Sequence, residues 1–224
     1  TRLLILNTPG NPTGRVMPIN EMKALAEVLR RYPNLLIMSD EIYEFLISEK
    51  QKHYSLAAVA PDLKERILTV NGFAKAWAMT GWRVGYLSGN EKVVKAAAAL
   101  QSQSTSNVCS FAQRGALAAI QGPTDKIRIM ALSYNKRRSL LTEALKEIKG
   151  INLVDPTGAF YAFPELPSNQ PDSDVFCKNA LEEEGLALVP GSVFGNTRCI
   201  RISCAVSNEK IKEGITRLNH LISK

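Results

Sequence analysis

The chain has 224 residues, of which 45% are hydrophobic and 22% carry a charged side chain, a balance typical of a soluble globular protein. No apolar run approaches the length of a membrane span, so we expect no membrane partner. The net charge of +7 is scattered, without a recognition motif or interleaved aromatic residues. We therefore also expect no nucleic-acid partner.

The first part of the chain alternates between apolar runs and a helical segment. Pro18 suits the first turn of this helix, which carries an apolar stripe at helical spacing. This alternation predicts an α/β fold with a doubly wound, mostly parallel sheet. Its strands are predicted over residues 3–6, 35–39, 67–71 and 84–88.

The remainder is first helical and then mixed. Helices are predicted over residues 91–103, 110–121 and 123–149, and the last is long enough to run from one domain into the next. Beyond Gly150, short strands and helices alternate, which indicates a small α+β domain. Its strands are predicted at 151–154, 158–163, 186–189 and 198–203, and its helices at 172–184 and 207–222.

Polar side chains follow the first two predicted strands. Asn11 lies in a Pro/Gly turn after the first, where its role can be purely structural. Asp40 ends the second, and Tyr43 is three residues further on, on the same side if a helical turn begins there. A single aspartate in this position is often only a cap or a solvated loop residue.

Lys75 follows the third strand in a loop of small residues, and Arg83 comes eight residues later. Considered alone, Lys75 is a solvated loop lysine. In an open α/β sheet, however, the strand ends converge on one crevice, which is where ligands bind. A partly desolvated lysine amine in that crevice is a usable nucleophile toward a carbonyl.

The cysteines and histidines give no pattern of a metal site. The four cysteines lie in apolar or small-residue settings without a Cys-x-x-Cys pair, and only two histidines are present. We therefore expect no metal and a reducing, cytoplasmic location. The residues concerned are Cys109, Cys177, Cys199, Cys204, His53 and His220.

Several ordered motifs resemble those of fold-type I aminotransferases that use pyridoxal 5′-phosphate, and in particular bacterial-type aspartate aminotransferases. The resemblance runs from the first residue to the last, and the stretch from Lys75 to Tyr86 is the most specific part. The matching segments are Asn11–Gly14, Asp40–Tyr43, Asn71–Lys75, Met79–Tyr86, Gln101–Asn107, Thr157–Phe163, Val189–Gly195 and Ile200–Ser203.

The resemblance implies a role for each strand-end residue. Lys75 would bind the cofactor aldehyde covalently and move the proton at the substrate α-carbon. Asp40 would keep the ring nitrogen protonated. Tyr43 and Asn11 would hydrogen-bond the ring hydroxyl, and Arg83 would hold the phosphate with its forked donors.

The substrate and partner are implied in the same way. Arg201 would hold the substrate α-carboxylate together with Asn11, although an arginine on a strand is more often an edge-surface residue. The resemblance implies that the intact parent enzyme transaminates aspartate, or another dicarboxylic or aromatic amino acid, with 2-oxoglutarate, and we expect the 224 residues alone to be inactive. It also implies a homodimer whose loop 102–107 lies at the subunit interface.

The resemblance begins inside the family's large domain. The chain is thus similar to the carboxyl-terminal part of a longer enzyme, with residues 1–135 from the cofactor-binding domain and 136–224 as the small domain. Gly72 and Ala74 stand where many relatives have a hydroxyl residue that contacts the phosphate. Val108 stands where a proline is common. The open alternatives are a C–S lyase, a cyclopropane-forming synthase, or a catalytically inactive fragment.

Overall fold

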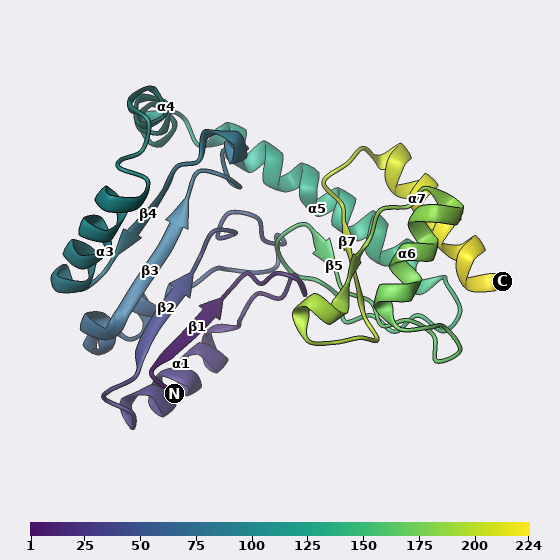
Figure 1. The fold of residues 1–224 in the computed structure, drawn as a ribbon, viewed down its shortest axis with the longest axis horizontal. Helices are drawn as coiled ribbons and strands as arrows, with labels where there is room; N and C mark the ends of the chain where they lie inside the picture. Colours follow the sequence, from purple (N-terminus) through teal and green to yellow (C-terminus); the bar gives the residue numbers. More distant parts are fainter. The chain divides into compact units, whose positions relative to one another are not determined.

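The computed structural model describes residues 1–224, and its first part is built on a four-stranded sheet in the order β1-β2-β3-β4 (Figure 1). The first three strands are parallel, and β4 runs antiparallel to β3. Each strand lies within one residue of its predicted bounds, so the mostly parallel α/β sheet is confirmed. The strands are β1 Leu3–Asn7, β2 Leu36–Asp40, β3 Ile67–Gly72 and β4 Gly85–Ser88.

Helix α1 (Ile19–Arg30) packs its apolar stripe against this sheet. Met22 and Leu29 are buried in one cluster with Ile37 of β2 and Ile67 of β3. An apolar stripe at helical spacing has to find such a sheet face in order to be removed from water. This contact accounts for the helix that the sequence predicts after Pro18.

Two short helices lie between β2 and β3, where only a loop was predicted. They are α2 (Leu56–Val59) and a 3-10 helix over Pro61–Arg66. Segments of four to six residues complete one or two turns, which is too short to produce a helical period in the sequence. The side chain of Leu56 is fully buried in the cluster under α1, so tertiary packing fixes this segment.

Three longer helices follow, at α3 (Glu91–Ser104), α4 (Ser110–Gln121) and α5 (Asp125–Lys146). All three were predicted, and α5 is shorter at both ends than its predicted range. Helix α3 has no buried residue, and large apolar side chains on α4 are exposed.

The last part of the chain forms a second sheet in the antiparallel order β5-β7-β6, with helices α6 (Ser173–Glu184) and α7 (Asn208–Ser223). These helices and α5 share a core that includes Leu145, Phe176 and Leu218. The strands are β5 Tyr161–Ala162, β6 Val189–Pro190 and β7 Ile200–Ser203.

The strands of this second sheet are shorter than predicted. The predicted strand 151–154 is reduced to an isolated bridge between Asn152 and Glu165. The predicted strand 158–163 keeps two residues, because Ala159 has a φ of 51° and breaks the extended backbone.

The chain divides into two compact units within α5. The first unit contains Thr1–Pro9 and Val16–Ala131, and the second contains Gly10–Arg15 and Leu132–Lys224. Segment Gly10–Arg15 therefore belongs with the second unit although it precedes α1. The domain boundary expected after residue 135 stays a prediction.

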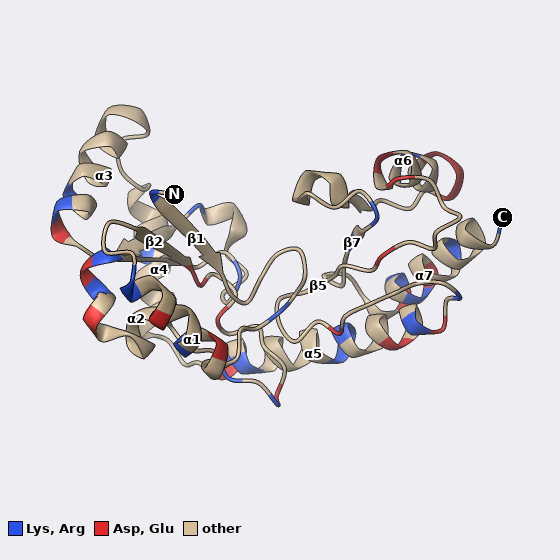
Figure 2. Ribbon diagram, turned by 90° about the horizontal axis from the view of Figure 1, so that it is seen from below, with Lys and Arg blue, Asp and Glu red and all other residues tan.

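Charged residues of both signs are interleaved on the helices, as Figure 2 shows for α5 and α7. On α7, Glu213 pairs with Lys210 and with Arg217. Exposed pairs of this kind contribute little stability, on the order of 0–1 kcal/mol each. None of the helices combines the length and the hydrophobicity that a membrane-spanning segment needs.

Candidate functional site

Asp40 is the last residue of β2, and hydrogen bonds at the strand end hold it in place. The amide of Ile42 donates to the Asp40 carboxylate oxygen Oδ1 at 3.1 Å. The side-chain amide of Asn7 donates to the Asp40 backbone carbonyl, also at 3.1 Å, and the two residues are paired in register across β1 and β2. The neighbouring strand and the following turn together fix this carboxylate.

Tyr43 and Lys75 come together beside this strand end. Tyr43 is only 5% exposed, and the Lys75 Nζ lies 5.7 Å from the centroid of its ring. This separation is within the range of a cation–π contact. The tyrosine comes from the turn after β2 and the lysine from the loop after β3, so two adjacent strand ends contribute to one place.

The loop that carries Lys75 is held by hydrogen bonds across it. The Thr80 hydroxyl donates to the Ala74 carbonyl at 2.8 Å, and the Met79 amide donates to the Phe73 carbonyl at 3.2 Å. These bonds fold the loop back on itself before β4 begins. The lysine is therefore presented by a compact loop and not by an extended one.

Arg83 ends this loop with an exposed side chain. Its backbone has a φ of 56°, in the left-handed region that non-glycine residues adopt rarely. Its Nη1 donates to the Thr80 carbonyl at 3.1 Å. Strained backbone of this kind gathers at ligand-binding sites, and this guanidinium is accessible to an anion.

In the second unit, Arg201 on β7 contacts Asn11 and two aromatic rings. Its Nη1 donates to the Asn11 side-chain oxygen at 2.9 Å. The guanidinium carbon lies 4.6 Å from the ring centroid of Tyr161 and 5.2 Å from that of Phe194. The Arg201 Nε is buried without a hydrogen-bond partner. An unpaired buried donor is destabilising by about 1–3 kcal/mol, so this nitrogen marks a place for an acceptor.

Gly14 holds the Asn11 turn close to the strand that carries Tyr161. Its φ is 66°, and a Cβ at this position would lie 2.7 Å from the Gly158 carbonyl and 2.9 Å from that of Tyr161. The amides of Thr157 and Gly158 donate to the Gly14 carbonyl at 2.9 and 2.6 Å. Only glycine fits both the backbone angle and the close approach.

The predicted residues thus lie in two sets. Asp40, Tyr43 and Lys75 are in the first unit together with Arg83, and Asn11 and Arg201 are in the second. The convergence of all of them on one crevice stays a prediction.

A buried polar network that was not predicted lies directly after Asp40. Glu41 is 3% exposed, and its Oε1 accepts hydrogen bonds from the hydroxyls of Ser39 and Ser55 at 2.9 and 2.8 Å. Its Oε2 lies 3.1 Å from the His53 Nε2. Only the strand-end position of Glu41 could have signalled this role, because the fold brings in His53 and Ser55.

Glu44 is a second carboxylate beside this network. Its Oε1 accepts a hydrogen bond at 2.7 Å from the Asn71 side chain at the end of β3. Potential ligand atoms of Glu41, Glu44 and His53 lie within 4.8 Å of one another, a grouping that no motif in the sequence predicts.

The two carboxylates have pKa values shifted in opposite directions. Burial by itself raises the pKa of Glu41, but hydrogen bonds from His53, Ser55 and Ser39 outweigh it and hold the pKa below its usual value. Burial also raises the pKa of Glu44, and there the single bond from Asn71 does not compensate.

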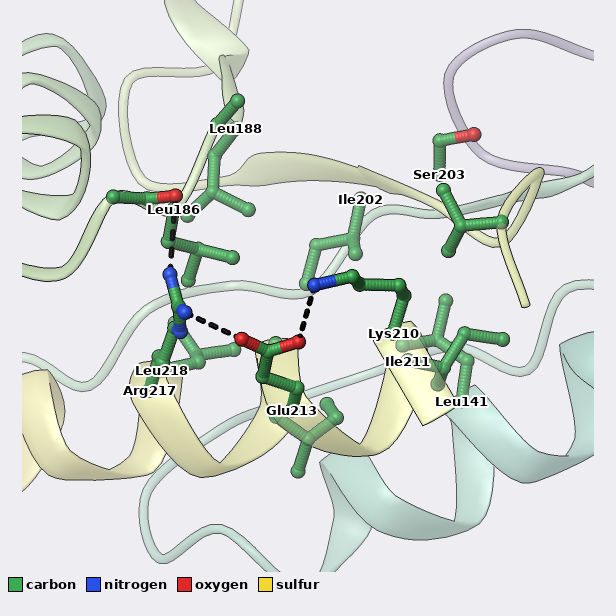
Figure 3. A pocket seen from close by; sticks show the side chains of 15 residues that line it. Leu141, Leu186, Leu188, Ile202, Ser203, Lys210, Ile211, Glu213, Arg217 and Leu218 are labelled. Atoms are coloured by element: carbon green, nitrogen blue, oxygen red, sulfur yellow. Dashed lines mark hydrogen bonds and ion pairs between the residues drawn. The ribbon is translucent and has the colours of Figure 1, made fainter. Parts of the chain in front are cut away.

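A separate cavity of about 430 Å³ lies in the second unit, against α7 (Figure 3). Ile202 and Ser203 of β7 line it, and Arg201 does not. The charged side chains that line it bond among themselves. Its apolar lining includes Leu141, Leu186, Leu188, Ile215 and Leu218.

Comparison with known proteins identifies close relatives. The model of the family "Aminotransferase class I and II" matches residues 1–218. A probable aspartate/prephenate aminotransferase of Rickettsia felis is 43% identical over 97% of the chain and 56% of its own length. The aspartate aminotransferase of Bacillus subtilis is 41% identical, over the whole chain and 58% of its own length. The chain thus spans just over half the length of these relatives.

Solved structures agree with the sequence relatives. The aspartate aminotransferase from Rhizobium meliloti superimposes with a TM-score of 0.92 and 36% identity, covering 99% of this chain and 58% of the other. The aromatic aminotransferase from Pyrococcus horikoshii gives a TM-score of 0.93 and 35% identity, covering 100% and 60%.

We predict opposite pH dependences for Glu41→Gln and Glu44→Gln. The lowered pKa of Glu41 stabilises the fold above the unfolded pKa, and this stability is lost as pH falls through the folded pKa. The raised pKa of Glu44 has the reverse effect, so its stabilisation is present at low pH and lost as pH rises through the folded pKa.

Urea unfolding between pH 3.5 and 7 would measure these effects. Glu41→Gln should lower the free energy of unfolding by about 1–3 kcal/mol at pH 7 and by less in acid. Wild type should gain stability relative to Glu44→Gln as pH falls. Parallel pH profiles for the two variants would contradict at least one of the two assignments.

Proposed function

The chain belongs to the class I and II aminotransferase family, and from this we propose that its protein transfers amino groups between amino acids and 2-oxo acids with pyridoxal 5′-phosphate. The observation that carries the proposal is the contact of the Lys75 amine with the Tyr43 ring, beside the strand end that holds Asp40. An amine, a phenol and a carboxylate at adjacent strand ends suit an aromatic aldehyde with a ring nitrogen and a ring hydroxyl.

The donor set of the first unit fits this cofactor. Lys75 would bind the aldehyde, and Asp40 would hold a proton on the ring nitrogen. Tyr43 would hydrogen-bond the ring hydroxyl, and the exposed guanidinium of Arg83 would hold the phosphate. For Asn11, which belongs to the second unit, a bond to the same hydroxyl stays a prediction. When bound, the cofactor supplies an electron sink for negative charge at the substrate α-carbon.

The unpaired Nε of Arg201 supports a carboxylate at this side chain. A guanidinium binds a carboxylate best through two parallel hydrogen bonds, and Arg201 already has one Nη donor fixed by Asn11. The rings of Tyr161 and Phe194 confine its plane. Arg201 would therefore bind the substrate α-carboxylate in one orientation, and Lys75 would move the proton at the α-carbon.

Aspartate, or another dicarboxylic or aromatic amino acid, is the proposed amino donor, and 2-oxoglutarate the acceptor. The names of the relatives, which include aspartate, aspartate/prephenate and aromatic aminotransferases, support this range. In the reaction the donor becomes its 2-oxo acid, and 2-oxoglutarate becomes glutamate.

We also propose a cytoplasmic homodimer. Cys109, Cys177, Cys199 and Cys204 are all free thiols, which persist in a reducing compartment. Exposed apolar side chains on α3 and α4 support an interface next to residues 102–107, the first three of which are the end of α3 and not loop as predicted, because such patches mark association surfaces. They include Leu100, Phe111, Leu117 and Ile120.

Lys75→Ala should abolish covalent cofactor binding, because the proposed nucleophile is lost. Purified wild type, this variant and the exposed control Lys52→Ala would be mixed with pyridoxal phosphate, reduced with borohydride and mapped by mass spectrometry. Wild type and the control should carry the adduct on Lys75. An adduct of equal yield on another lysine of Lys75→Ala would refute the assignment.

Arg201→Lys should raise the KM for the amino acid about 10- to 100-fold, because a lysine keeps the charge but loses the forked pair of donors. Steady-state assays of the full-length parent protein with aspartate and 2-oxoglutarate would measure it, with the exposed Arg31→Lys as control. An unchanged KM would exclude Arg201 from substrate binding.

Phe111→Glu should shift the proposed dimer to monomers, because it places a charge in an apolar surface that is 74% exposed in this chain. Sedimentation velocity would measure the mass, with the exposed second-unit variant Val154→Glu as control. A dimer that persists in Phe111→Glu would place the interface elsewhere.

A further inference from the structure

Glu41 is a buried carboxylate whose hydrogen bonds are provided by three segments. Ser39 lies within β2, His53 in the loop that follows, and Ser55 immediately before α2. Because an ionised carboxylate only accepts hydrogen bonds, the His53 Nε2 must carry the proton in this pair. A buried charge is tolerated only when it is paired in this way, so Glu41 fixes these segments to one another.

The backbone of Glu41 is bonded on both sides as well. Its amide donates to the Val70 carbonyl of β3 at 2.9 Å, and its carbonyl accepts from the Glu44 amide at 2.9 Å. The residue thus joins the end of β2 to β3 at the start of the turn that carries Tyr43. A displacement of Glu41 has to displace its neighbour Asp40 and this turn.

Glu44 continues the connection to the lysine loop. Its carboxylate accepts from the Asn71 side chain, whose oxygen in turn accepts from the Gly72 amide at 2.8 Å. Gly72 is the last residue of β3, and the loop of Lys75 begins there. These hydrogen bonds therefore connect the turn with Tyr43 to the start of the loop with Lys75.

We propose that Glu41 is a positioning residue for the reaction: its buried hydrogen bonds to Ser39, His53 and Ser55 set the place of Asp40 and Tyr43 relative to Lys75. This inference rests on the proposed function. Glu41 acts through its neighbours, because both of its oxygens are taken by the serine hydroxyls and the imidazole. Because the Glu41 oxygens already accept these hydrogen bonds, we favour a hydrogen-bonded network over a metal site at Glu41, Glu44 and His53.

The test compares Glu41→Gln with Glu49→Gln, an exposed glutamate nearby in the chain. The glutamine has the size of Glu41 but presents a donor where an acceptor is needed. In the cofactor-free protein, amide hydrogen exchange of Ile42, Glu44 and Leu46 should become about tenfold faster in Glu41→Gln. Exchange in the middle of α1 should quicken by no more than the loss of global stability that urea unfolding of the same variant measures. Exchange at Ile42, Glu44 and Leu46 that quickens only to this common extent would mean general destabilisation and would overturn the proposal.

A second readout uses the cofactor. The midpoint pH of the visible absorbance change of protein with pyridoxal phosphate should shift in Glu41→Gln and stay unchanged in Glu49→Gln. His53→Gln should shift the midpoint pH by the same amount. The double variant Glu41→Gln/His53→Gln should shift it no further than either single variant, because the two residues act as one unit. Additive shifts would overturn the proposal.

The two readouts separate the inference from the proposed function. If wild type forms no adduct on Lys75, the proposed function fails, and the exchange rates still test the network. If wild type forms the adduct and Glu41→Gln matches it in exchange and absorbance, the inference alone fails. Stabilisation of wild type by added zinc that Glu41→Gln abolishes would replace the positioning role with a metal site.

Discussion

The in-register parallel pairing of β1, β2 and β3 is the constraint on which the geometry of the first unit depends. Asn7 lies opposite Asp40, and Asp40 lies opposite Val70. The pairing continues past the strand ends, where the Thr8 amide donates to the Asp40 carbonyl and the Glu41 amide to the Val70 carbonyl. Beyond this point the backbone of β1 and β2 has no ladder partner, and its polar groups must be satisfied by side chains or turns. Polar residues are therefore required at this edge for structural reasons before any chemistry makes use of them.

Glu41 and Glu44 show how the number of donors decides the state of a buried carboxyl group. The two residues are three positions apart in the turn after β2, and burial acts on both, yet the pKa of one is lowered and that of the other raised. Glu41 receives three hydrogen bonds, whereas Glu44 receives one from Asn71. Burial is common to both and cannot explain the difference. The arrangement of Ser39, His53 and Ser55 around Glu41 is therefore what keeps a full negative charge inside this part of the fold.

The features that could be predicted from the sequence are those that short segments encode. The strands of the first sheet and the helices α3 and α4 follow from local apolar patterns, and Lys75 stands out because it follows a strand. The bond between Asn11 and Arg201 joins residues 190 positions apart, and only the resemblance to known enzymes suggested a common role for them. The pair of Glu41 and His53 gave no such signal, because neither residue type nor spacing identifies a hydrogen bond made by tertiary packing.

Several positions in this chain depart from the usual backbone conformations or leave a buried donor unpaired. The four non-glycine residues with positive φ are Ala78, Arg83, Ser106 and Ala159. The first two lie in the lysine loop, the third in the proposed interface loop, and the last just before Tyr161. The unpaired buried donor is on Arg201. The sequence supplies three hydrogen-bond donors to Glu41 but leaves these positions with a strained backbone or an unpaired donor. Selection for stability alone does not account for this combination. Backbone strain of this kind persists where a bound ligand makes use of it.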